Sequence, residues 1–165
     1  EGAVGDWSAL YLFEDKGIVI EEAVMGVMLF NGTMCIGRLL GNRLGKHLTS
    51  KPVVVGGYLL GSIAMGLIVF LPGHASMYTY LLLGISLAMI VPNLFSAMGE
   101  QNVIPMTQAV ATSTMLGYMG ILMGPALIGF IAHGTSLTVA FIVLTTLLVV
   151  SAGIGKYAYH LMSKD

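Results

Sequence analysis

Charged residues are scarce in this chain of 165 residues: Asp, Glu, Lys and Arg together make up only 9%. A typical soluble domain carries roughly 25%. Hydrophobic residues account for 56% of the chain, and the formal net charge is -1. A nearly neutral chain with so few cations does not provide the basic surface that nucleic-acid binding needs. The composition predicts a membrane protein.

Motifs for nucleotide and metal chemistry are lacking too. The sequence contains no G-x-x-x-x-G-K-[ST] loop, no C-x-x-C, no H-E-x-x-H and no cluster of His and Asp. We therefore expect no ATP coupling, no metal and no cofactor. The single cysteine, Cys35, excludes an internal disulfide, and its place inside an apolar run predicts a packing role.

Enzymatic activity is not expected. An intramembrane serine protease needs a nucleophile and a base on facing helices. Ser86 is not followed by a glycine two positions later, as such a nucleophile would be. The four histidines all fall at expected loops or helix ends, far from such a nucleophile: His47, His74, His133 and His160.

Long apolar runs dominate what the chain does contain. A helix needs about 20 residues to cross roughly 30 Å of hydrocarbon. Four runs of about this length carry no charge, and a fifth is interrupted only by Arg38, whose long side chain is expected to reach the headgroups. The predicted spans are 23–41, 53–71, 78–98, 109–132 and 138–155.

Residues 1–13 predict a sixth, partial span. At 1.5 Å per residue this segment covers only about 20 Å, so it resembles the second half of a helix. The chain has no initiator Met and no cationic start followed by a cleavage site, which argues against a signal peptide. We expect the sequence to begin partway through a longer protein.

The distribution of cations predicts the orientation, because loops rich in Lys and Arg stay in the cytoplasm. Loop 42–52, with Arg38 beside it, is the most cationic part of the chain. Placing this loop inside puts six of the seven Lys and Arg residues and the C-terminus in the cytoplasm. The exception is Lys16, in a loop that also carries acids. We expect a multi-pass protein of a bacterial inner membrane.

Glycine is frequent inside the predicted spans, where small residues allow helices to pack closely. Two sets have helical spacing, and the second is followed by a proline that would let the helix bend. These predicted packing residues are Gly57 and Gly61, and Gly117, Gly120, Gly124 and Pro125.

The loop after predicted span 23–41 carries a family signature. The major facilitator superfamily has a loop motif, small-acid-Arg-x-Gly-basic-basic, which occurs once in each half of the protein. The copy in the second half resembles the segment Leu40-Gly41-Asn42-Arg43-Leu44-Gly45-Lys46-His47 of this chain. In that family the acid helps latch one conformation. Asn42 replaces the acid here, so the resemblance implies a hydrogen bond without the charge. The alternative is that Arg43, Lys46 and Lys51 only determine topology, and the two interpretations are compatible.

The start of the chain narrows the resemblance. Glu1-Gly2-Ala3-Val4-Gly5-Asp6-Trp7-Ser8 is similar to the E-G-A-x-x-D-W-S stretch in the seventh helices of the bacterial MosC-like branch. The resemblance covers nearly the whole chain. It implies the C-terminal half of a twelve-helix fold, with helices seven to twelve, the seventh truncated, and an N-terminal half as partner.

Glu1 and Asp6 are the leading candidates for solute chemistry, because ionised acids at membrane depth are costly unless they face a cavity or a partner. At 100° per residue they share an arc with Gly2, Gly5 and Ala9. The resemblance implies that this helix lines the pathway, where the acids would bind a cationic or hydroxylated solute or carry a proton. The alternative is a structural pairing with a cation in the absent half.

Other polar residues in the spans are secondary candidates. Pro92 frees a backbone carbonyl in predicted span 78–98, which makes Asn93 and Ser96 possible cavity residues. Asn31 and Tyr118 are weaker candidates, since lone polar residues often bond between helices.

The function implied by the resemblance is transport of a small polar solute by alternating access, coupled to a proton or another ion. Drug or metabolite efflux on the same fold is an alternative. A membrane scaffold or sensor that transports nothing is a third possibility, from a different class.

Overall fold

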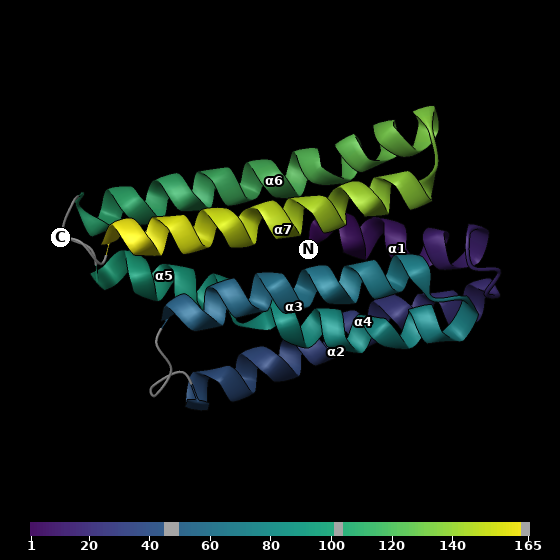
Figure 1. Ribbon diagram of the computed structural model, residues 1–165, viewed down its shortest axis with the longest axis horizontal. Coiled ribbons are helices and arrows are strands. Elements are labelled where there is room, and N and C mark those ends of the chain that lie inside the picture. Colours follow the sequence, from purple (N-terminus) through teal and green to yellow (C-terminus); the bar gives the residue numbers. More distant parts are fainter. Residues whose placement is uncertain (45–49, 101–103, 163–165) are drawn as a thin grey trace.

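The computed structural model describes residues 1–44, 50–100 and 104–162, and within these ranges it contains helices and no β-strand. Seven helices follow one another in this part of the chain (Figure 1). They are α1 (Gly2–Glu14), α2 (Ile20–Leu44), α3 (Ser50–Phe70), α4 (Gly73–Ala88), α5 (Ile90–Glu100), α6 (Met106–Gly134) and α7 (Leu137–Met162).

The helices run side by side along the long axis of the bundle (Figure 1). Helix α2 packs mainly on α4, α3 packs on α4 and α7, and α1 packs on α2 and α6. Helix α1 starts about halfway along the neighbouring helices, so Glu1 lies near the middle of the bundle (Figure 1). This position matters for the site described below.

Five stretches of the described residues are long and apolar enough to cross a membrane: Ile20–Gly41, Lys51–Phe70, Gly73–Gly99, Met106–Gly134 and Leu137–Leu161. Large apolar side chains on their outer faces remain exposed, among them Phe70 and Phe130. A bundle with apolar side chains on the outside suits lipid rather than water. The predicted class, an all-α polytopic membrane protein, is confirmed.

The predicted span 78–98 is divided between two helices, α4 and α5, which meet at Met89. Pro92 has no N-H to donate to the Ala88 carbonyl, so the hydrogen-bond ladder is interrupted there. At the next carbonyl, the backbone N-H and the side-chain Nδ2 of Asn93 both donate to the Met89 oxygen, at 3.2 Å and 2.8 Å. Asn93 thus ties the start of α5 to Met89, where α4 and α5 meet.

The predicted loop 42–52 is shorter in the structure, because α2 continues to Leu44 and α3 starts at Ser50. Gly45 and Lys46 of the loop signature lie outside the described residues, as do the side chains of Asn42 and Arg43. Gly41 is buried, and a β-carbon there would overlap the Met89 side chain. Gly41 thus lets α2 approach the break between α4 and α5.

Aromatic side chains form the centre of the core. The rings of Tyr11 and Phe141 stack at 4.1 Å and join α1 to α7. Tyr80 and Phe30 are also fully or almost fully buried, between α4 and α2. Cys35, by contrast, is exposed on α2, so it does not pack among the described residues.

Close helix packing occurs at some of the predicted glycines. A β-carbon at Gly57 would lie 2.8 Å from the Ser86 carbonyl oxygen, and one at Gly61 would lie 2.9 Å from Leu87. Both glycines therefore bring α3 against α4. The approach of α4 to α2 at Gly84, which the sequence did not single out, is closer still. A β-carbon added at Gly84 would overlap the Phe30 carbonyl and the Thr33 hydroxyl of α2.

The glycine stripe of α6 is different. β-Carbons at Gly117, Gly120 and Gly124 would meet no atom within 4 Å in the described part of the chain. The prediction that these three glycines pack against another helix of this bundle is therefore not met, because no described helix covers that stripe. They line cavities instead.

Lys16 has a structural role that explains its place outside the cationic loops. Its ammonium donates to the carbonyls of Val69 and Leu71, at 2.6 Å and 2.9 Å, and lies 5.3 Å from the centre of the Tyr11 ring. A cation at a helix C-terminus is favourable for the helix dipole, here that of α3. Burial lowers the pKa of the Lys16 ammonium, and the neighbouring Asp15 carboxylate opposes this shift.

Candidate functional site at the start of helix α1

An ion pair joins α1 to α2 near the middle of the bundle. The Arg38 Nη2 atom donates to both carboxylate oxygens of Glu1, at 3.1 Å and 2.9 Å. Arg38 was expected to extend towards the headgroups; in the structure its guanidinium is held by Glu1. A cation for the acids was expected in the other half of the protein, whereas this one lies 37 residues further along the same chain.

The pair is only half covered. The side chains of Arg38 and Glu1 are 44% and 38% exposed. Charged side chains at membrane depth face a bundle interior or a water-filled cavity rather than lipid, because their transfer into hydrocarbon costs a few kcal/mol or more. The open side of this pair therefore faces water or another part of a larger protein.

Asp6 lies five residues beyond Glu1 on α1, about 140° around the helix and about 7.5 Å along its axis. Its side chain is exposed, and it has no hydrogen-bond or ion-pair partner among the residues that the structure describes. Gly5, between the two acids, is also open, since a β-carbon there would meet nothing within 4 Å. The opposite side of α1 is packed, with Val4 and Tyr11 buried.

A cavity of about 430 Å³ opens beside the ion pair. Its polar groups are the pair itself and the hydroxyls of α6, and its wall comes from α5. It is lined by Glu1, Arg38, Val91, Leu94, Phe95, Met98, Ser113, Thr114, Gly117, Tyr118 and Ile121. Ser113 and Thr114 form no hydrogen bond through their side chains with described residues, so these hydroxyls are available.

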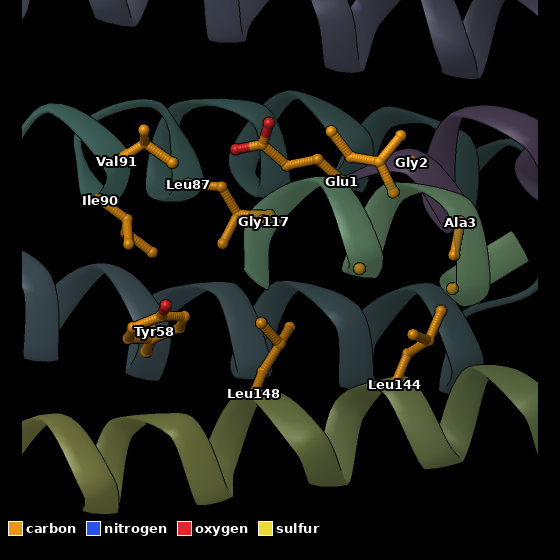
Figure 2. Close-up of a pocket in the computed structure, with 13 residues that line it drawn as sticks. Glu1, Gly2, Ala3, Tyr58, Leu87, Ile90, Val91, Gly117, Leu144 and Leu148 are labelled. Atoms are coloured by element: carbon orange, nitrogen blue, oxygen red, sulfur yellow. The ribbon is translucent and has the colours of Figure 1, made fainter. Parts of the chain in front are cut away.

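A second cavity, also about 430 Å³, borders the Glu1 side chain as well. Figure 2 shows the Glu1 carboxylate extending over this cavity, with Tyr58 of α3 and Leu144 and Leu148 of α7 across from it. Most of the lining of both cavities is apolar. The Glu1 carboxylate thus borders two largely apolar cavities.

Helix α1 is fixed against α6 by Trp7. The indole Nε1 donates to the Pro125 carbonyl at 3.0 Å. Gly129 leaves room for the ring, since a β-carbon there would lie 2.7 Å from the indole Cζ2 atom. Pro125 lies inside α6, and Gly2 faces the same turn of that helix. This contact holds the start of α1 in place.

The remaining candidates from the sequence lie away from the pair. Asn93 is buried at the break between α4 and α5, where it donates to Met89. Ser96 donates back to Pro92, and Asn31 donates back to Val27 within its own helix. None of these three lines either cavity; Tyr118 is the exception among the remaining candidates, because it lines the cavity beside Arg38.

Arg38, Ser113 and Thr114 were missed as site residues. The signal for Arg38 was present, since it is the only charge inside an apolar run, but its position near the run's end suggested an interfacial role. The two hydroxyl residues gave no signal, because Ser and Thr in membrane helices often bond to their own backbone. Among the described residues, no group of three or more His, Cys, Asp or Glu side chains could hold a metal ion.

The fold and the site together define a class: a multi-pass helical membrane protein with charged groups and a cavity at the middle of its spans. Proteins of known description point further. An uncharacterized MFS-type transporter of Yersinia pestis is 42% identical over 144 residues, which are 86% of this chain and 37% of that protein. The membrane protein MosC of Rhizobium meliloti is 29% identical over 157 residues, or 93% of this chain and 39% of that protein.

An uncharacterized transporter of Sinorhizobium fredii is 27% identical over 147 residues, covering 87% of this chain and 38% of that protein. No family model and no solved structure matches the chain. Over most of its length the chain is similar to a transporter of the major facilitator superfamily, the family that its motifs predicted, and its partial coverage of these relatives fits the predicted C-terminal half. It spans less than two fifths of the length of the curated relatives it matches.

Proposed function

We propose that this chain is half of a secondary active transporter of a bacterial inner membrane, which moves a small polar solute by alternating access and couples it to a proton or another ion. The N-terminal half would complete the pathway, and the C-terminus would face the cytoplasm. The relatives named as transporters support the general function.

One observation carries the proposal. Glu1, Arg38 and Asp6 lie at the middle of a bundle whose helices are otherwise apolar, and all three remain open on one side. Charges in such a place are costly and mark pathways for solutes or ions. A scaffold or sensor would have no use for the unpaired Asp6 carboxylate at this depth.

The test is solute uptake into proteoliposomes by the complete transporter that contains this chain, with a panel of small metabolites. We expect Asp6→Asn to lower coupled uptake by at least about tenfold, or ~1.4 kcal/mol, because the amide removes the exposed charge that α1 carries closest to the ion pair. Glu14→Gln, at the end of the same helix, is the matched control and should transport normally.

Two results would count against this proposal. If the wild-type transporter moves no solute of the panel, the scaffold or sensor function gains support. If Asp6→Asn and Glu14→Gln transport equally well, Asp6 is not part of the pathway.

A further inference from the structure

The two sides of the contact between α3 and α7 differ. One side borders a cavity beside Glu1, through Tyr58 and Leu148. The other side carries a groove of about 360 Å³. Its lining includes Gly66 and Phe70 of α3 and Ile142, Thr146 and Val149 of α7. Thr146 is about 160° around α7 from Leu148, so this side, which we call the α3–α7 seam, faces away from the start of α1.

The groove has the chemistry of a site for a hydrocarbon chain. Its lining is apolar apart from the hydroxyls of Thr145 and Thr146. These donate to the carbonyls of Phe141 and Ile142 in the preceding turn, at 2.9 Å and 3.0 Å. Because both hydroxyls are satisfied within α7, a chain that fills the groove would bury neither of them without a partner.

An exposed stripe leads along α7 from this groove to a lysine. Its members follow one another at spacings of three and four residues, so they share one face of the helix. They are Ile142, Thr146, Val149, Gly153 and Lys156. Gly153 leaves a gap in the stripe, since a β-carbon there would meet nothing within 4 Å. Lys156 lies about 10 Å along the helix from Val149, well within the length of an acyl chain that fills half of a ~30 Å hydrocarbon core.

A second lysine lies at the same end of the seam. A β-carbon at Gly155 would lie 3.8 Å from Val55 and 4.0 Å from Val54, so α7 approaches the first turns of α3 there. Lys156 directly follows Gly155, and Lys51 lies one turn before the two valines. Neither lysine has an ion-pair or hydrogen-bond partner among the described residues. Neither helix contains Asp or Glu, so both charges are uncompensated.

Two uncompensated cations at the end of an apolar groove are complementary to an anion that carries a hydrocarbon chain. Lys51 precedes predicted span 53–71 and Lys156 follows predicted span 138–155, so we expect both ammonium groups at the depth of the headgroups. Lys51 lies in the first turn of α3, where the helix dipole also favours an anion. Basic sites between helices on the cytoplasmic side attract the headgroups of anionic lipids.

We propose that the α3–α7 seam binds an anionic phospholipid. The headgroup phosphate lies on Lys51 and Lys156, and one acyl chain runs past Gly153 and Val149 towards the groove. The proposed cytoplasmic C-terminus assigns this lipid to the inner leaflet. The binding itself goes beyond the proposed function and does not depend on transport.

The first test is native mass spectrometry of the complete transporter in detergent, with phosphatidylglycerol or phosphatidylethanolamine of the same acyl chains. We expect phosphatidylglycerol to bind at least about fivefold more tightly, because one lysine near an anionic headgroup contributes about this factor. The variant with both Lys51→Gln and Lys156→Gln should bind one phosphatidylglycerol fewer than the wild type. Lys46→Gln, the matched control from predicted loop 42–52, should bind as many as the wild type.

The second test concerns the acyl chain. Gly153→Trp places an indole in the gap of the stripe and leaves both lysines unchanged, so it should reduce the bound phosphatidylglycerol. Gly56→Trp is the matched control. A β-carbon at Gly56 also meets nothing within 4 Å, but this position is about 140° around α3 from Lys51. This variant should bind the lipid as the wild type does.

Three results would overturn the inference. The first is equal binding of the two lipids by the wild type, which stays measurable even if a variant does not fold. The second is an equal loss in Lys46→Gln and in the double lysine variant, which would show a general attraction to positive charge. The third is a dimer that Gly153→Trp converts to a monomer, which would assign the seam to a second copy of the chain. A transporter that binds the lipid but moves no solute would leave the inference in place and count only against the proposed function.

Discussion

Arg38→Gln will lower the yield of folded transporter and abolish solute uptake. The substitution leaves the Glu1 carboxylate without the guanidinium that holds it at 2.9 Å. Breaking a fully buried pair costs about 3–5 kcal/mol. Because both side chains here are roughly two fifths exposed, we expect a smaller loss of stability, about 1–2 kcal/mol. The loss of uptake should be larger, since no described cation can replace Arg38 beside Glu1.

The double variant Glu1→Gln with Arg38→Gln distinguishes structure from function. It removes both charges, so the folded yield and the melting temperature in detergent should return close to those of the wild type. Uptake should stay absent in the double variant, because neither a cation for the solute nor an acid for the proton remains. Full uptake by the double variant would show that the pair is only structural.

Gly84→Ala will strongly destabilise the contact between α2 and α4. The added β-carbon would overlap the Phe30 carbonyl and the Thr33 hydroxyl. The carbonyl belongs to the backbone of α2 and cannot turn away, so the helices must separate. Overpacking of this kind costs about 1–3 kcal/mol, which corresponds to a fall in melting temperature of roughly 2–12 °C for a chain of this size.

Gly56→Ala is the matched control for this prediction. Gly56 also lies inside a helix, α3, but a β-carbon there would meet nothing within 4 Å. Alanine is the better helix former by about 1 kcal/mol, so this variant should melt at the same temperature as the wild type or slightly higher. Equal melting temperatures for the two variants, measured on the purified protein in detergent, would contradict the packing of α4 on α2.

The helices themselves could be predicted from the sequence, because a run of about 20 apolar residues in a membrane has few alternatives to the α-helix. The ends of the helices were harder to predict. Helix α2 continues to Leu44, although the run of apolar residues stops earlier. Backbone hydrogen bonding continues a helix past the edge of its apolar stretch, and composition does not record this. Pro92 did predict an interruption of the helix. The sequence did not predict that Asn93 would donate two hydrogen bonds to the Met89 carbonyl there.

For the candidate site, the sequence predicted the acids but not their contacts. Glu1 and Asp6 were predictable as costly acids, since cost depends on residue type and depth alone. The partner of Glu1 was not, because Arg38 is 37 residues away and only the packing of α2 on α1 brings it near. The glycines divide in the same manner. Spacing alone could not tell Gly57, which packs on α4, from Gly117, which lines a cavity.

The most direct test of the account is whether water reaches the open face of α1. In the complete transporter, with the exposed Cys35 first replaced by Ser, a cysteine is introduced by Gly5→Cys between the two acids. The matched position is Gly66→Cys, in a cleft between α3 and α7 lined mainly by apolar side chains. A β-carbon at either position would meet no atom within 4 Å.

We expect a membrane-impermeant maleimide to label the Gly5→Cys variant and to leave the Gly66→Cys variant unlabelled, because thiols react in water as thiolates and stay protonated in hydrocarbon. A transported solute should slow the labelling at position 5. If the Gly5→Cys variant is as unreactive as the Gly66→Cys variant, the face that carries Glu1 and Asp6 does not line a water-filled pathway, and the proposed site is wrong.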